Sequence, residues 1–370
     1  MASTTSPRPR AGILEIEPYV AGQSSVPGRN RIIKLSSNET PLGPSPLAIE
    51  AFRAAGADLY SYPEGSGRDL RAALARKYGL EAERIVLGNG SDEILTQLAQ
   101  AYLSPGDEAV ATEHSFPIYR IATLSANARS VLVPNRDNRT DIDGLIAALT
   151  PRTRIVFVCT PDNPNGTYIP KTELERLHAD LPADVLLVID GAYAEYARAG
   201  DYSAGESLVR RAENVVMTRT FSKIYGLAAL RIGWAYAPLA IAEIINRIRL
   251  PFNTNRPSQM AALAALGDEA HFKTAYAHNA KWLPWLKSEI DKLGVRVVPS
   301  EANFLLLDFA ALGDGVALAA DGALKNEGLI LRTLVNYGLP ECLRLTVGLE
   351  EANRAVVQAL AKFLAGRTKK

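Results

Sequence analysis

The segment NVVMTRTFSKIYGLAALRIG, residues 214–233, joins an apolar run to a polar turn that carries Lys223. The apolar run has the length and composition of a buried strand. A lysine that leaves such a strand at the carboxyl edge of a sheet is poorly placed for packing and well placed for a binding site. Two hydroxyls flank it, from Thr220 and Ser222, and Arg231 follows eight residues later. Taken alone, the segment favours a solvated surface lysine, and the rest of the chain has to change that interpretation.

Apolar strands and helical segments alternate on both sides of this segment. Strands are expected at 84–88, 109–114, 130–134, 154–159 and 184–190, and helices at 45–57, 69–78, 91–103, 172–181, 241–249 and 258–266. Continuous apolar strands that alternate with helices are typical of a mainly parallel sheet covered on both faces. The predicted fold class is therefore α/β, with a large domain at residues 38–269.

The pattern changes after about residue 270. A long helix is expected over 272–293, with a kink at Pro284. Strands, an Ala-rich helix at 316–325 and a last helix at 350–365 follow, which predicts a smaller α+β domain at 270–370. Residues 1–37 begin with a Pro- and Gly-rich stretch and are predicted to form an extended arm.

Composition excludes several classes of protein. The 370 residues carry 41 Lys and Arg against 40 Asp and Glu, a net charge of +1 that argues against a nucleic-acid or anionic-membrane partner. No apolar run approaches the roughly 20 residues that span a bilayer, and the polar N-terminus does not resemble a secretory signal. Two cysteines and four scattered histidines predict a reduced, cytoplasmic chain without a structural metal.

Polar residues also follow other predicted strands. Asp190 ends the strand at 184–190, where it could cap a helix or pair with a pyridinium nitrogen. Asn163 lies in a turn whose Pro and Gly residues are explained by the turn itself. The GNGSDE turn opens a helix that Ser91 or Asp92 could cap, and amides at a helix start can bind an anion. This turn is neither a dinucleotide fingerprint nor a Walker loop.

Nine segments, in this order, resemble the fold-type I pyridoxal 5′-phosphate (PLP) aminotransferases, above all the histidinol-phosphate aminotransferase branch. They are LSSNETPLGPSP (35–46), YPEG (62–65), VLGNGSDEIL (86–95), HSFPIY (114–119), TPDNPNG (160–166), DGAYAEY (190–196), TFSKIYGLAALRIG (220–233), RLPFNTN (249–255) and CLRLTVG (342–348). The resemblance extends from about residue 14 to the end of the chain. It implies the two-domain fold of that family, PLP as cofactor, and a homodimer with a shared active site.

The resemblance assigns roles around the PLP ring. Lys223 would bind the cofactor covalently and later move the substrate Cα proton. Asp190 would pair with the pyridine nitrogen, which keeps the ring an electron sink. Tyr193 and Asn163 would bond the ring oxygen O3′, and Phe116 would stack on the ring face.

Further residues would hold the PLP phosphate. They are Ser91 and Asp92 through their amides, Thr220 and Ser222 through their hydroxyls, Arg231 through its guanidinium and Tyr62 from the neighbouring subunit. A loop aromatic that packs on Pro63 is the alternative interpretation of Tyr62.

Four residues would bind substrate. Arg344 would capture a carboxylate or phosphate, Arg332 would bind the substrate phosphate, and Tyr19 would close over the substrate. Asn38 would lie near the substrate, although it could equally be a turn residue. For Arg332 the alternative is an ion pair with Glu327 at the surface.

The predicted reaction is transamination between L-histidinol phosphate and 2-oxoglutarate. Two departures from the family pattern, Asp162 in the TPDNPNG turn and Gly191 after Asp190, leave the subfamily open. The alternatives are an aromatic amino-acid aminotransferase and, more distantly, a PLP lyase such as an amino-acid-phosphate decarboxylase. A PLP-dependent transcription regulator would need a DNA-binding domain ahead of residue 14, and only about 13 residues precede it.

Overall fold

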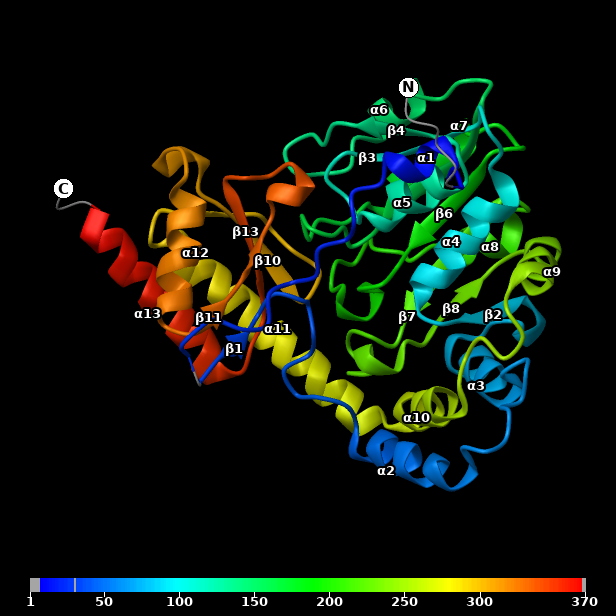
Figure 1. Ribbon diagram of the computed structural model, residues 1–370, viewed down its shortest axis with the longest axis horizontal. Coiled ribbons are helices and arrows are strands. Elements are labelled where there is room, and N and C mark those ends of the chain that lie inside the picture. Colours follow the sequence, from blue (N-terminus) through cyan, green and yellow to red (C-terminus); the bar gives the residue numbers. More distant parts are fainter. Residues whose placement is uncertain (1–6, 30, 368–370) are drawn as a thin grey trace.

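The computed structural model describes residues 7–29 and 31–367, so residues 1–6 and 30 of the predicted arm lie outside it, as does most of the stretch on which the absence of a signal was predicted. Two bodies lie side by side, with the long helix α11 (Glu269–Asp291) running from the larger to the smaller (Figure 1). Pro284 lies inside this helix. Within the described ranges no helix is both long and apolar enough to cross a membrane.

The larger body is built on a seven-stranded sheet in the order β2-β8-β7-β6-β5-β3-β4. Its strands are β2 (Ile85–Gly88), β3 (Glu108–Thr112), β4 (Arg129–Val133), β5 (Thr153–Cys159), β6 (Leu186–Asp190), β7 (Val215–Thr220) and β8 (Gly233–Tyr236). The two pairings of β8, with β2 and with β7, are antiparallel, and the other pairings of this sheet are parallel. The predicted mainly parallel α/β sheet is confirmed.

Helices cover both faces of this sheet. The helices of the larger body are α2 (Pro46–Ala54), α3 (Arg68–Tyr78), α4 (Ser91–Tyr102), α5 (Ile118–Ser125), α6 (Ile142–Ala147), α7 (Lys171–Asp180), α8 (Glu206–Arg211), α9 (Leu239–Ile248) and α10 (Arg256–Gly267), with 3-10 turns at Ala55–Asp58, Ala82–Arg84, Ala194–Tyr196 and Ala228–Leu230. Successive residues of β6 enter opposite cores: Leu187 and Ile189 pack on one face, Leu186 and Val188 on the other. Burial on both faces explains why this strand reads as an unbroken apolar run.

The smaller body carries a four-stranded antiparallel sheet, β12-β13-β10-β9. Its elements are β9 (Arg296–Val297), β10 (Phe304–Asp308), α12 (Val316–Asn326), β11 (Leu329–Ile330), β12 (Arg332–Thr333), β13 (Cys342–Thr346) and α13 (Glu350–Arg367), with 3-10 turns at Ala310–Leu312 and Val335–Tyr337. Its core is separate from those of the large sheet.

The N-terminal arm was predicted to be extended, but the structure shows that it is not wholly so. It contains a short helix, α1 (Ala11–Leu14), held to the large body where the Gly12 amide donates to Asn127 Oδ1 over 2.9 Å. The arm ends in β1 (Ile33–Lys34), which pairs in parallel with β11 of the smaller body. The arm therefore connects the two bodies along their shared boundary.

A buried arginine on β7 ties the large sheet to the loop after β6. The Arg219 guanidinium bonds Glu195 over 3.0 Å and Glu206 over 3.1 Å, and lies over the rings of Tyr78 and Trp234. The Arg219 and Glu195 side chains are almost wholly shielded from solvent. A Cβ at Gly191 would lie 3.1 Å from Arg219 Cδ, so this arginine accounts for the small residue at that position.

We predict that Arg219→Ala lowers the free energy of unfolding by about 3–5 kcal/mol, because the Glu195 carboxylate stays buried without its ion-pair partner. Urea unfolding followed by circular dichroism measures the change. Arg176→Ala is the control, because it breaks solvent-exposed pairs with Asp143 and Glu173 and should change stability far less. Equal losses in the two variants would contradict a stabilising role for the buried cluster.

Candidate active site

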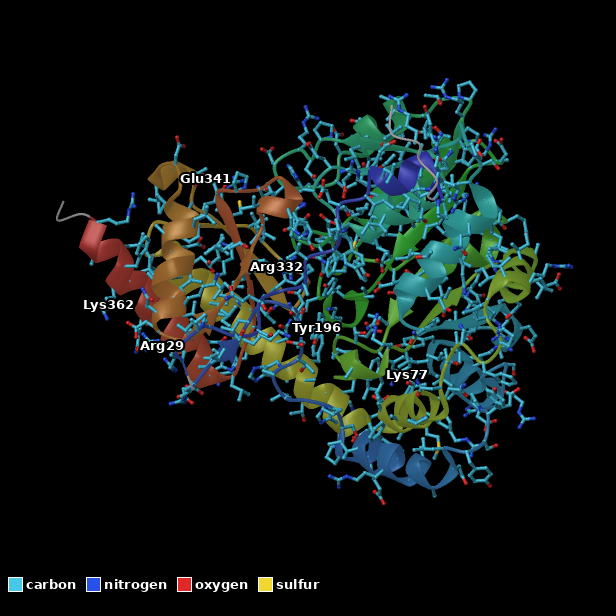
Figure 2. All side chains as sticks on the ribbon, viewed as in Figure 1. Arg29, Lys77, Tyr196, Arg332, Glu341 and Lys362 are labelled. Atoms are coloured by element: carbon cyan, nitrogen blue, oxygen red, sulfur yellow. The ribbon has the colours of Figure 1, made fainter. Side chains whose placement is uncertain are left out.

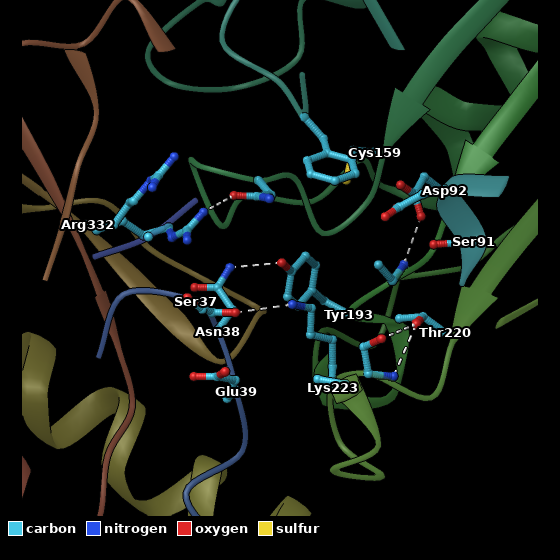
Figure 3. A pocket seen from close by; sticks show the side chains of 18 of the residues that line it. Ser37, Asn38, Glu39, Ser91, Asp92, Cys159, Tyr193, Thr220, Lys223 and Arg332 are labelled. Carbon is cyan, nitrogen blue, oxygen red and sulfur yellow. Dashed lines mark hydrogen bonds between the residues drawn. The ribbon is translucent and has the colours of Figure 1, made fainter. Parts of the chain in front are cut away.

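A cavity lies at the carboxyl ends of β5, β6 and β7, closed from the other side by β12 and β13 of the smaller body (Figure 3). It is the place at which a parallel sheet gathers the residues that follow its strands. Of the residues singled out in the sequence, the cavity is lined by Tyr19, Asn38, Ser91, Asp92, Phe116, Asn163, Asp190, Tyr193, Thr220, Ser222, Lys223, Arg231, Arg332 and Arg344. Residues about 320 positions apart in the chain thus share one site.

Lys223 follows β7 in a turn and points into this cavity (Figure 3). Its Nζ donates to the Ser37 carbonyl over 3.4 Å and lies 5.5 Å from the centre of the Tyr193 ring. Burial, reinforced by the positive charge of Arg344, lowers the pKa of this amine to about 8. The amine of Lys223 therefore loses its proton near pH 8 and is then uncharged and nucleophilic.

Asp190 ends β6 with a carboxylate that is 2 % exposed. It accepts hydrogen bonds from Tyr119 Oη at 2.7 Å, Thr218 Oγ1 at 3.2 Å and the Ala192 amide at 3.2 Å. Burial raises its pKa to about 6, while the Tyr119 bond opposes the rise. Such a group can pair with a cationic ring nitrogen.

Tyr119 was missed as a site residue in the sequence. It occupies the first turn of α5, its ring is stacked on Phe157 at 5.1 Å, and the Phe116 ring meets it edge-on at 6.0 Å. Burial and helical position make it look like an ordinary core residue. Only its hydroxyl, aimed at the carboxylate at the end of β6, distinguishes it.

The start of α4 forms a cradle of hydrogen-bond donors that could hold an anion. The N-cap is Gly90 and no side chain caps the helix, so the prediction that Ser91 or Asp92 caps it is wrong. Gly90 has φ 82° and ψ 166°, a conformation that is essentially restricted to glycine. A Cβ on Gly90 would lie 2.5 Å from Arg231 Nη2, and one on Gly233 would lie 2.4 Å from the Ser91 amide. Both glycines therefore keep the cradle open.

The cradle's side chains are linked to one another. Arg231 Nη1 donates to Ser222 Oγ over 3.3 Å and Nη2 to Asp92 Oδ2 over 3.1 Å. Thr220 Oγ1 donates to Ser222 Oγ over 3.0 Å. Amides at a helix start, two hydroxyls and a guanidinium form a donor set suited to a phosphate group.

The turn after β5 is held by a second buried carboxylate, which the sequence argument treated only as a departure from the family pattern. Asp162 accepts from Ser115 Oγ at 3.1 Å and Asn165 Nδ2 at 2.7 Å, and burial raises its pKa to about 7. The neighbouring Asn163 offers its amide oxygen to Arg344. Asp162 thus fixes the turn that presents Asn163 to the cavity.

Two buried arginines enter the cavity from the smaller body. Arg344 Nη2 donates to the Ser36 carbonyl over 2.9 Å, and its buried Nε has no partner within the described residues. Arg332 Nη2 donates to the Val20 carbonyl of the arm over 2.6 Å. A cationic wall of this kind suits an anionic ligand.

The alternative pairing of Arg332 with Glu327 is wrong. Glu327 instead bonds Lys362 over 2.9 Å. Figure 2 places Lys362 at the outer edge of the smaller body, whereas Arg332 lies toward the larger one. Arg332 is thus a cavity residue rather than a surface ion-pair partner.

Tyr62 does not line the cavity of its own chain. Its ring is 77 % exposed and is stacked on Phe252, with the centres 4.5 Å apart. Leu59, Tyr60 and Leu250 beside it are also exposed. We call these five residues the apolar patch.

Within the described residues no group of three or more metal-binding side chains occurs.

Comparisons with known proteins agree with this geometry. The family model for class I and II aminotransferases matches residues 30–360. The chain is 51 % identical to the histidinol-phosphate aminotransferase of Rhodopseudomonas palustris strain BisB18 and 50 % identical to that of Nitrobacter hamburgensis, over 97 % of this chain and 99 % of each relative. The crystal structure of histidinol-phosphate aminotransferase from Sinorhizobium meliloti, in complex with PLP, superposes with a TM-score of 0.82 at 29 % identity, covering 90 % of this chain and 91 % of that one. This chain belongs to the class I and II aminotransferase family.

Proposed function

We propose that this protein uses PLP to transfer the amino group of L-histidinol phosphate to 2-oxoglutarate, a step of histidine biosynthesis. The products would be imidazole acetol phosphate and glutamate. The observation that supports the proposal is that one cavity holds a lysine with a lowered pKa, a buried carboxylate, a cradle of donors suited to a phosphate and two buried arginines. About half of the residues are identical to those of two histidinol-phosphate aminotransferases, over almost the whole length of each chain.

The residues of the cavity fit PLP. A Cβ at Gly233 would meet the Ser91 amide and one at Gly90 would meet Arg231, so these glycines leave free the donors proposed for the PLP phosphate, which are the Ser91 and Asp92 amides, Thr220, Ser222 and Arg231. Asp190 is of the right charge for a protonated pyridine nitrogen. Lys223 could reach the carbonyl carbon of the cofactor, with Phe116 against the ring and Tyr193 and Asn163 near its O3′.

When bound, PLP supplies an electron-withdrawing ring that acidifies the Cα proton of the substrate. Asp190 would hold the proton on the ring nitrogen. Lys223, as a free amine, would take the proton from Cα and pass it to the cofactor. Tyr193 would donate its hydroxyl proton to O3′. These roles use groups that already face one cavity.

The substrate would be held by its charges. The phosphate of histidinol phosphate could engage both Arg332 and Arg344, while the α-carboxylate of glutamate needs Arg344 alone. Tyr19 lies at the mouth of the cavity, where it could close over either substrate. An aromatic amino-acid aminotransferase is the second candidate, because Tyr19, Phe116 and Tyr337 all line the cavity.

A homodimer with a shared active site would explain the apolar patch. The apolar patch joins two exposed apolar segments, 59–62 and 250–252, through the stacked rings of Tyr62 and Phe252, and exposed apolar groups of this kind mark interaction sites. Pairing of two patches would bury them and carry Tyr62 to the cradle of the neighbouring chain. We further propose a cytoplasmic location, where the two buried, unpaired cysteines of the described chain would stay reduced.

Lys223→Ala tests the central assignment. Turnover of histidinol phosphate with 2-oxoglutarate, followed by glutamate formation, should fall by several orders of magnitude, because both the nucleophile and the base are lost. The wild-type holoenzyme should be yellow. Near wild-type turnover in the variant would refute the role of Lys223.

The pH dependence of cofactor uptake tests the lowered pKa of Lys223. Below about pH 8 the amine is protonated and cannot attack, so the rate at which apoprotein takes up PLP should rise with pH and level off above about 8. Stopped-flow absorbance measures it. In Arg344→Ala the plateau should move to higher pH, because a positive charge that lowers this pKa is gone. A wild-type rate that still climbs at pH 10 would contradict the prediction.

Arg332→Ala distinguishes the candidate donors. A charge-assisted hydrogen bond contributes roughly 1.5–3 kcal/mol, so kcat/KM for histidinol phosphate should fall about 10- to 150-fold. For phenylalanine, whose carboxylate Arg344 can hold, the loss should be smaller. Equal losses for the two donors would contradict the phosphate-binding role, and a loss specific to phenylalanine would favour the aromatic aminotransferase.

A further inference from the structure

Asn38 links the two bodies at the cavity through hydrogen bonds of its side chain and its backbone. Its Nδ2 donates to Tyr193 Oη over 2.8 Å, its backbone amide donates to Thr346 Oγ1 over 3.0 Å, and Thr346 Oγ1 donates to its Oδ1 over 3.2 Å. Its carbonyl accepts from Asn303 Nδ2 at 3.0 Å. It is 1 % exposed. Both ends of the Asn38 amide thus bond protein side chains that lie on opposite sides of the cavity.

The backbone of Asn38 has a left-handed conformation. Its φ is 57°, a value that asparagine tolerates better than most residues other than glycine. This conformation is compatible with a turn, so the role of Asn38 has to be argued from its buried hydrogen bonds. Those bonds run to Tyr193 of the larger body and to Thr346 of the smaller one, which points to a positioning role.

The orientation of the Asn38 amide follows from Thr346. The Thr346 hydroxyl already accepts from the Asn38 backbone amide, so its own proton is available for Asn38 Oδ1. Nδ2 must then face Tyr193, as Figure 3 shows. Because the Tyr193 hydroxyl accepts this bond, its single proton is left to be donated into the cavity.

Thr346 belongs to the strand that also carries Arg344. The two residues are two positions apart on β13, so their side chains share one face of the strand. Arg344 bonds the Ser36 carbonyl over 2.9 Å, and the Thr346 amide bonds the Leu35 carbonyl over 3.0 Å. The segment from Leu35 to Asn38 is therefore fastened to β13 at several points and must move with it.

We propose that Asn38 is a positioning residue that fixes the Tyr193 hydroxyl as a donor to the cofactor and makes it follow the placement of β13. This replaces the substrate contact expected for Asn38 in the sequence, and it rests on the proposed function, since it takes Tyr193 to face PLP. Through Asn38, the strand that binds the substrate anion and the hydroxyl that tunes the cofactor form one unit.

The experiment is a pH titration of the visible absorbance of the holoenzyme. A hydroxyl that donates to the ionised O3′ stabilises the unprotonated form of the lysine-bound cofactor, so its loss should raise the pKa of the chromophore. Asn38→Gly removes the side chain while accepting the left-handed φ, so folding is retained. We expect it to raise the chromophore pKa by roughly one, a tenfold change in proton affinity.

Two further variants show whether Asn38 acts through Tyr193. Asn38→Asp would accept the Tyr193 proton instead of donating to it, and should raise the chromophore pKa at least as far as Asn38→Gly does. In a Tyr193→Phe background, Asn38→Gly should cause no further shift. A shift of equal size in both backgrounds, or none in either, would overturn the proposal, and a rise in KM for the donor with an unchanged chromophore would identify Asn38 as a substrate contact. A wild-type protein that forms no visible chromophore with PLP would refute the proposed function itself.

Discussion

The parallel alignment of β5, β6 and β7 is the constraint on which the site depends. Neighbouring parallel strands end at one edge, so the turn with Asn163, the carboxylate of Asp190 and the turn with Lys223 come together without any long-range adjustment. β8 returns antiparallel beside β7 and brings Arg231, just before its first residue, to the same edge. Burial of both faces of the sheet holds these strands in register, and the register places the three side chains at one cavity.

That constraint also explains which parts were predictable. Strands buried on both faces, such as β6, read as unbroken apolar runs, so the end of β6 locates Asp190. Lys223 follows β7, but only the resemblance to a family distinguished it from a solvated surface lysine. The two arginines proposed to bind substrate have no such local signal. Arg344 and Arg332 lie on short strands of the smaller sheet, and only the resemblance to a family pointed to them.

The features that the sequence did not predict depend on contacts between distant segments. Tyr119 looks like core until its hydroxyl is seen to bond Asp190, 71 residues away. The sequence predicted a side-chain cap from Ser91 or Asp92, yet α4 begins at Gly90 without one, which leaves the first amides of the helix free for the anion proposed to bind there. The arm residues at β1 gave no sign that they pair with β11, because two residues are too few for a periodic pattern.

The charged side chains of the cavity shift the pKa of Lys223 in opposite directions. Burial and the Arg344 guanidinium lower the pKa of Lys223, whereas Asp92 and Glu39 raise it. The hydrogen-bond partners of Arg344 within the described residues are a neutral carbonyl and a neutral amide, so a bound anion would be the group that balances its charge. An anionic substrate on Arg344 would neutralise that charge and strengthen Lys223 as a base at the moment when a base is needed. The same guanidinium would thus favour the free amine before the substrate binds and favour proton abstraction afterwards.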